Sequence, residues 1–83
     1  MFSADRILKL VTDAIPGAEV QVRDLMGDSD HFEITVITTV FEGKGALERH
    51  RMVYKALGGA VGQEIHAATL KTMTPKEAGG SHD

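Results

Sequence analysis

The chain has 83 residues, a formal net charge of -3 and no cysteine. This length leaves room for one compact domain and excludes a second. The lack of cysteine excludes disulfide scaffolds, thiol catalysis and cysteine-ligated metal centres built by this chain alone. No apolar run approaches the roughly 20 residues of a membrane span and no secretory signal pattern opens the chain, so we expect a cytoplasmic protein that does not contact membranes.

The first element is predicted to be a helix with Ser3 as its N-cap and Asp5 in its first turn, where the helix dipole favours a carboxylate. Pro16 and Gly17 end it. Its apolar positions recur every three or four residues and form one stripe: Ile7, Leu8, Val11, Ala14 and Ile15.

A β-hairpin is predicted next. Residues 18–25 alternate, with Ala18, Val20 and Val22 on one face and polar side chains on the other. A polar connection over 27–30 leads into a second strand over 31–39, in which the apolar residues are Phe32, Ile34 and Val36.

The second half begins with a helical stretch over 46–61, and Gly58-Gly59 is expected to divide it into two short helices. The apolar positions of this stretch are Ala46, Leu47, Val53, Tyr54, Leu57, Ala60 and Val61. A strand follows over 65–73, with two possible inward sets, Ile65/Ala67/Met73 and Ala68/Leu70. Proline at 75 could begin a last turn, and residues 78–83 are expected to be a flexible tail. This order favours an α+β fold with helices on one face of a three-stranded sheet.

No enzyme motif is present, so we expect a protein that is not an enzyme. Histidine is the residue type of interest, because imidazole binds transition metals, and it occurs at positions 31, 50, 66 and 82. His31 and His66 stand where strands are predicted to begin, and such positions are accessible yet held by a rigid element. Taken alone, each would more often be a packing or surface residue.

Four blocks in series resemble the signature of the BolA family: Phe41–Lys44, Leu47–Leu57, Ile65–Ala67 and Thr72–Glu77. The resemblance extends from the first helix to Glu77, which gives one BolA-like domain over residues 1–77. The loop with Ser29 to Phe32 is similar to the IbaG-like branch. The fold that this resemblance implies is the class II KH-like αββααβ arrangement with a three-stranded mixed sheet.

The resemblance also implies a role. BolA-like proteins are adaptors that bind a monothiol glutaredoxin and share a 2Fe-2S cluster with it, so no cofactor is expected in the isolated chain. Glutaredoxin and glutathione provide thiolates, and the BolA partner provides the histidine that matches His66. A second ligand comes from the loop between the first two strands. The position that is cysteine in some relatives is Asp28 here. The candidates for the second ligand are His31, which is the nearest imidazole, and the weaker oxygen ligands Asp28 and Asp30. Ala78 stands where the family has tryptophan.

Two surfaces are expected from the resemblance. The glutaredoxin-binding surface would consist of Arg49, His50, Arg51, Tyr54, Lys55, Thr74 and Pro75. The alternative role is a DNA-binding transcriptional regulator in the stress response, which would use the basic side chains Lys44, Arg49, Arg51 and Lys55 within residues 44–61. Residues 1–43 carry 3 basic and 8 acidic side chains and residues 44–83 carry 6 and 4, so DNA binding would be weak and confined to the second half. The free protein is expected to be a monomer or a weak homodimer.

Overall fold

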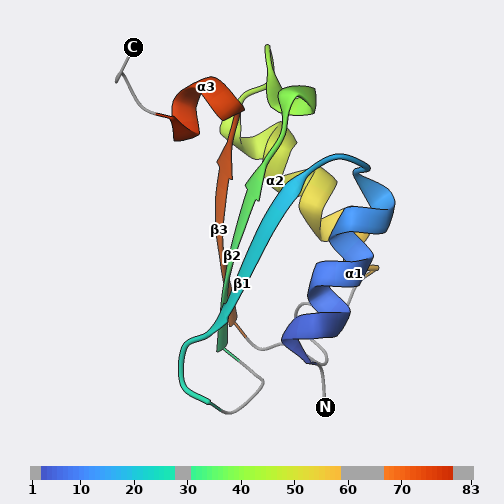
Figure 1. The fold of residues 1–83 in the computed structure, drawn as a ribbon, viewed down its shortest axis with the longest axis vertical. Helices are drawn as coiled ribbons and strands as arrows, with labels where there is room; N and C mark the ends of the chain where they lie inside the picture. The colour runs from blue at the N-terminus through green and yellow to red at the C-terminus, as the bar shows by residue number, and fades with distance from the viewer. Residues whose placement is uncertain (1–2, 28–30, 59–66, 80–83) are drawn as a thin grey trace.

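The computed structural model describes residues 3–27, 31–58 and 67–79, and Figure 1 shows the order of its elements. In chain order they are α1 (Ala4–Ala14), β1 (Glu19–Asp24), β2 (His31–Ile37), the short 3-10 helix η1 (Thr39–Phe41), α2 (Ala46–Ala56), β3 (Ala67–Met73) and α3 (Pro75–Ala78). The second of the two helices predicted within 46–61, and the first two residues of the strand predicted over 65–73, lie outside the described residues.

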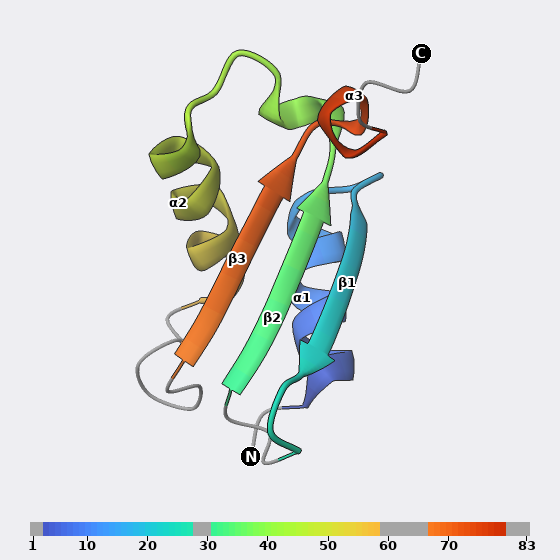
Figure 2. The same ribbon diagram turned by 90° about the vertical axis from the view of Figure 1, so that its left-hand side faces the viewer.

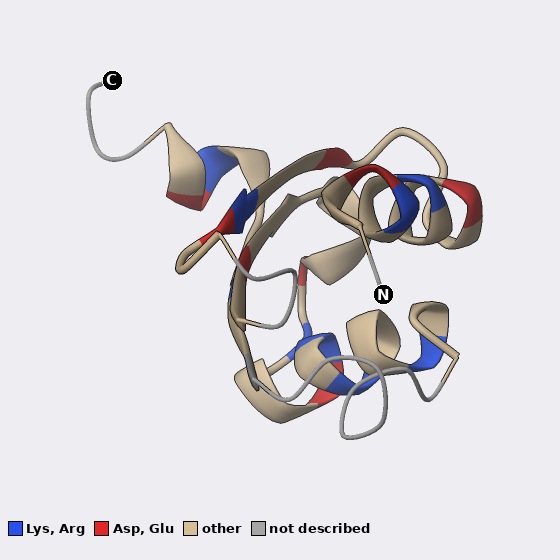
Figure 3. Cartoon of the chain, turned by 90° about the horizontal axis from the view of Figure 1, so that it is seen from below, with Lys and Arg blue, Asp and Glu red and all other residues tan. Residues whose placement is uncertain are grey.

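The three strands form one mixed sheet in the order β1-β2-β3 (Figure 2). β1 pairs antiparallel with β2, and β2 pairs parallel with β3. α1 and α2 cover one face of this sheet, which curves around them in the end-on view (Figure 3). The predicted α+β class, with a three-stranded mixed sheet and the main helices on one face, is therefore confirmed.

α1 begins where the sequence predicts. The Oγ of Ser3 accepts a hydrogen bond from the backbone N–H of Arg6 at 3.2 Å, which satisfies one of the free donors of the first turn. Asp5 lies in that turn. Gly17, with a φ of 85°, then redirects the chain into β1, a conformation that residues with a Cβ adopt only with strain.

The core fills the space between the sheet and the two helices. Its buried members are Ile7, Val11, Ile15, Phe32, Ile34, Val36, Phe41, Val53 and Leu57. β2 contributes every second residue, as expected for the central strand of a sheet with one covered face. Several predicted stripe positions are exposed instead: Leu8, Ala14, Ala46, Leu47 and Tyr54. The two helices bury only the part of each apolar stripe that faces the sheet, so the remaining apolar positions stay at the surface.

β2 ends two residues earlier than predicted. After Ile37, the N–H of Thr38 still donates to the carbonyl of Met73 at 3.0 Å. The Oγ1 of Thr38 then accepts from the N–H of Val40 at 3.2 Å and caps η1. This turn carries Phe41 into the core, so the β-branched run Thr38-Thr39-Val40 makes a cap and a 3-10 turn rather than strand.

The inward face of β3 is the one with Ala68 and Leu70, which pack against the core. The parallel register places them beside Phe32 and Ile34 of β2, two of the most deeply buried residues. Of the two inward sets that the sequence allows, the structure selects this one, because β2 fixes which residues of β3 face the helices.

The other face of the sheet carries an ion-pair cluster. Glu33 of β2 lies between Arg23 of β1 and Lys71 of β3, with nitrogen–oxygen distances of 3.3 and 3.4 Å. The Glu33 side chain is only 17% exposed, whereas that of Arg23 is 72% exposed. Ion pairs with an exposed partner contribute about 0–1 kcal/mol each, so the cluster adds little to the stability of the fold.

Candidate functional site

α2 presents four neighbouring side chains to the surface, which we call the α2 stripe: Leu47, Arg51, Tyr54 and Lys55. Their spacing of three and four residues places them on adjoining turns of one side of the helix. Leu47 is 65% exposed and Tyr54 is 41% exposed. Two large apolar side chains beside two cations make a surface suited to a partner with apolar and acidic groups.

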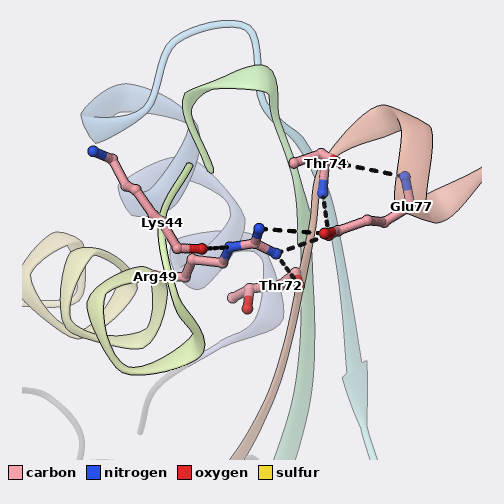
Figure 4. A network of polar contacts seen from close by, with 5 residues as sticks. All are labelled: Lys44, Arg49, Thr72, Thr74 and Glu77. Carbon is pink, nitrogen blue, oxygen red and sulfur yellow. Dashed lines mark hydrogen bonds and ion pairs between the residues drawn. The ribbon is translucent and has the colours of Figure 1, made fainter. Parts of the chain in front are cut away.

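Arg49 lies on the same helix but is turned into the fold (Figure 4). Its Nε donates to the carbonyl of Lys44 at 2.8 Å, and its Nη1 donates to the carbonyl of Thr72 at 3.3 Å. Nη1 and Nη2 also donate to the two carboxylate oxygens of Glu77, at 2.8 and 3.3 Å. The side chain is 13% exposed, and its guanidinium carbon lies 5.7 Å from the ring centre of Phe41. We call these contacts of Arg49 with Lys44, Thr72 and Glu77 the Arg49 clamp.

The clamp continues into the capping box of α3. The N–H of Glu77 donates to Thr74 Oγ1 at 3.1 Å, and the N–H of Thr74 donates to Glu77 Oε1 at 2.9 Å. The hydrogen bond from Arg49, assisted by the one from the backbone of Thr74, lowers the pKa of Glu77. The same contact with Glu77 raises the pKa of Arg49. A single carboxylate therefore joins α3 to α2 and to the end of β3.

At the opposite end of the sheet, His31 opens β2 and is half-buried. Its partner on the neighbouring parallel strand is Ala67, the first residue of β3. The starts of the two strands therefore lie side by side (Figure 2). His66 immediately precedes Ala67 in the sequence, and Asp28 precedes His31 by three residues. These two predicted ligands lie outside the described residues.

The predicted surface residues separate into two groups. Arg51, Tyr54 and Lys55 stand together on the α2 stripe, while Pro75 is exposed on α3 and His50 is half-buried on α2. Arg49 and the buried Thr74 belong to the clamp and its helix cap.

Two residues absent from the prediction join these groups. Leu47 belongs to the α2 stripe, and its spacing of four and seven residues to Arg51 and Tyr54 was a usable signal. Glu77 completes the clamp from 28 residues beyond Arg49. The Thr-x-x-Glu spacing indicated a helix cap, but nothing local to it indicated the arginine.

An open hollow of about 440 Å³ lies beside the stripe, between the ends of α1 and α2. Ala14, Ile15, Met52, Lys55 and Ala56 line it. The volume is within the range of ligand pockets, but Lys55 is the one ionisable group of the lining, so these residues offer no acid–base pair.

Within the described parts of the chain, no three His, Asp or Glu side chains are grouped to hold a metal ion. No helix there is long and apolar enough to cross a bilayer.

Comparison with known proteins agrees with this architecture. The profile of the BolA-like protein family matches residues 11–77. A solved structure of a BolA homologue from Coxiella burnetii superposes with a TM-score of 0.78 at 39% identity, covering 95% of this chain and 99% of that one. Protein BOLA2 of Arabidopsis thaliana is 35% identical over 93% of this chain and 84% of its own length. The DNA-binding transcriptional regulator BolA of Escherichia coli is 37% identical over 69% of this chain and 54% of its own length. The matched stretch spans 37% of human BolA-like protein 1.

The fold and the site thus define a small α+β domain with a mixed three-stranded sheet, an exposed helix stripe and an arginine clamp at one end. The chain belongs to the BolA-like protein family. Proteins of this family are non-enzymatic, in agreement with the prediction from the sequence.

Proposed function

We propose that this chain is an adaptor that binds a monothiol glutaredoxin and shares a 2Fe-2S cluster with it, in iron-sulfur cluster trafficking or in iron and redox regulation. The observation that carries the proposal is the register between His31 and Ala67. Because β2 and β3 are parallel, their starts meet at one end of the sheet, and the sequence supplies histidine at 31 and at 66. We propose His66 as the first ligand, with His31 or Asp28 as the second.

The composition of the chain supports a shared cluster rather than a resident one. Iron-sulfur clusters are held mainly by thiolates, and this chain has no cysteine. The partner and glutathione would therefore supply the thiolates. Imidazole ligands from this chain would complete the iron coordination and raise the reduction potential of the cluster.

The α2 stripe is the proposed docking surface, together with Pro75 and the half-buried His50. Leu47 and Tyr54 offer apolar area, and Arg51 and Lys55 offer charges that would meet acidic groups of the partner. Arg49 and Thr74 would act indirectly, since the clamp fixes α3 and thereby Pro75 relative to α2.

The ligand assignment is tested by His66→Ala. We expect this variant, mixed with a monothiol glutaredoxin, glutathione, iron and sulfide under anaerobic conditions, to lose the visible circular dichroism of the wild-type complex. His82→Ala is the matched control, because it also removes one histidine, and it should retain the spectrum. A wild-type spectrum from His66→Ala would show that this imidazole is not a ligand. His31→Ala and Asp28→Ala, measured in the same way, identify the second ligand.

DNA binding is a second candidate, because a relative carries that description in its name. Two of the four basic side chains predicted for DNA binding are already paired with carboxylates of this chain. Arg49 is held by Glu77, and the Nζ of Lys44 lies 3.6 Å from Glu48 Oε2. Arg51 and Lys55 remain from the predicted set of four.

If Arg51 and Lys55 each neutralise one phosphate, a plot of the logarithm of the DNA association constant against the logarithm of the salt concentration should have a slope of about -2. We expect Arg51→Gln to reduce this slope by about one unit. Fluorescence anisotropy with a labelled duplex across a salt series measures both values. A slope near -4 would show that Lys44 and Arg49 also reach the DNA, and no binding at low salt would remove this candidate.

A further inference from the structure

Within the part of the chain that the structure describes, the outer edge of β1 is not paired with another strand. The N–H of Leu25 donates to the carbonyl of His31 at 2.8 Å, which fixes the hydrogen-bonding phase of the β1–β2 pair. In this register Glu19, Gln21 and Arg23 turn their peptide groups toward β2. The N–H and C=O groups of Val20 and Val22 therefore point away from β2, to the edge visible in Figure 2. Such an edge is a template for another strand.

The sequence of this edge is complementary to itself. Glu19-Val20-Gln21-Val22-Arg23 reads as acid, apolar, amide, apolar and base. When the strand is laid antiparallel on a second copy, each acid meets a base and each valine meets a valine. We propose that two copies of this chain associate through their β1 strands, antiparallel with Gln21 at the two-fold axis, into one six-stranded sheet.

The hydrogen-bonding phase agrees with this register. Val20 would lie opposite Val22 of the second copy in a hydrogen-bonded pair, and both residues have their peptide groups on the free edge. The two symmetric pairs supply four hydrogen bonds. Glu19 and Arg23 would face each other at non-hydrogen-bonded positions, where opposing side chains approach more closely. The valines stay on the helix-covered face and the charges on the open face.

The charges also favour this pairing. The carboxylate of Glu19 has a long contact with the Nε2 of Gln21, at 3.5 Å. Arg23 contacts Glu33 but remains 72% exposed, so its guanidinium has room for a second carboxylate. With Glu19 of the second copy beside it, the open face would carry the alternating series Glu19, Arg23, Glu33 and Lys71 across four neighbouring strands.

Other pairings lack this match. A shift of two residues in either direction pairs Glu19 or Arg23 with Gln21 of the second copy, and a larger shift pairs like charges. The outer edge of β3 offers nothing comparable, because Arg49 already donates to the carbonyl of Thr72 there and Lys71 would face Thr69 or another Lys71. The edge is short, so we expect a weak dimer with a dissociation constant of about micromolar to millimolar.

Charge reversal tests the proposal. Glu19→Arg and Arg23→Glu should each raise the dimer dissociation constant by about tenfold or more, measured by sedimentation without any partner protein. An equimolar mixture of the two variants should associate again, because each Arg then meets a Glu. Lys76→Glu, a charge reversal on α3, should leave dimerisation unchanged. Circular dichroism verifies that each variant is folded.

A single cysteine reports the register directly. Gln21→Cys should form a disulfide-linked dimer in a glutathione redox buffer, because the two copies of position 21 face each other. Glu19→Cys is the matched control and should remain mostly unlinked, since its two copies lie four residues out of register. The proposal is overturned if the wild type stays monomeric at millimolar concentration, if the mixed charge variants do not associate, or if both cysteine variants cross-link equally.

Discussion

Phe41→Ala is expected to lower the free energy of unfolding by about 3–5 kcal/mol, the usual cost of removing a buried aromatic ring. A domain of this size has a total stability of only about 4–12 kcal/mol, so the variant should be close to unfolding. The ring is fully buried, and it also lies under the guanidinium of Arg49. Its loss leaves a cavity in the core and weakens the support of the Arg49 clamp.

Thermal unfolding followed by circular dichroism checks this expectation, and the midpoint should fall by more than about 12 °C. The neighbouring residue provides the control. Val40 is 43% exposed, so Val40→Ala should cost well under about 1 kcal/mol. Phe41→Leu, which keeps much of the volume, should fall between the two. Equal effects of Phe41→Ala and Val40→Ala would contradict the placement of Phe41 in the core.

The strand pattern was the most predictable part of the fold. Phe32, Ile34 and Val36 alternate with polar residues, and this period of two decides which face of β2 is buried. The end of β2 was not predictable in the same way. Thr38 suits a strand by its β-branched side chain, and only its hydrogen bonds to Val40 and Met73 decide that it caps η1 instead.

The candidate site also has one part that local sequence predicts and one part that depends on tertiary contacts. The exposed group of Arg51, Tyr54 and Lys55 follows from helical spacing, which is local information. The role of Arg49 does not follow from local spacing, because its partner Glu77 is 28 residues away and lies beside it through the tertiary fold. In the sequence, Arg49 and Arg51 stand on either side of His50 and look equivalent, yet one supports the fold while the other faces solvent.

The Arg49 clamp gives the second large effect. Arg49→Met keeps an apolar stem of similar length but removes every donor to Lys44, Thr72 and Glu77. At neutral pH we expect the midpoint of thermal unfolding to fall on the order of 5–10 °C. Arg49→Lys should recover only part of this loss, since one ammonium cannot reproduce the planar fork that binds both Glu77 oxygens. Arg51→Met is the matched control, because Arg51 is exposed, and it should change the midpoint by much less.

The contribution of Glu77 should also depend on pH, with a sign that the structure fixes. The clamp lowers the pKa of Glu77 below its ordinary value of 4.5, so folding favours the ionised carboxylate. This stabilisation is complete above that ordinary value and is lost as the pH falls through the lower folded-state pKa. The difference in midpoint between wild type and Glu77→Gln should therefore be largest near neutral pH and should narrow as the pH falls below 4.5.

The difference in unfolding midpoint between wild type and Arg49→Met should also narrow as the pH falls, but it should not disappear. The hydrogen bonds from Arg49 to the carbonyls of Lys44 and Thr72 do not depend on the ionisation of Glu77. Unfolding midpoints of the three proteins across this pH series, with the double variant to measure the coupling, separate the ionic part of the clamp from its neutral part. A midpoint difference between wild type and Glu77→Gln that does not narrow as the pH falls below 4.5 would show that the carboxylate charge does not stabilise the clamp.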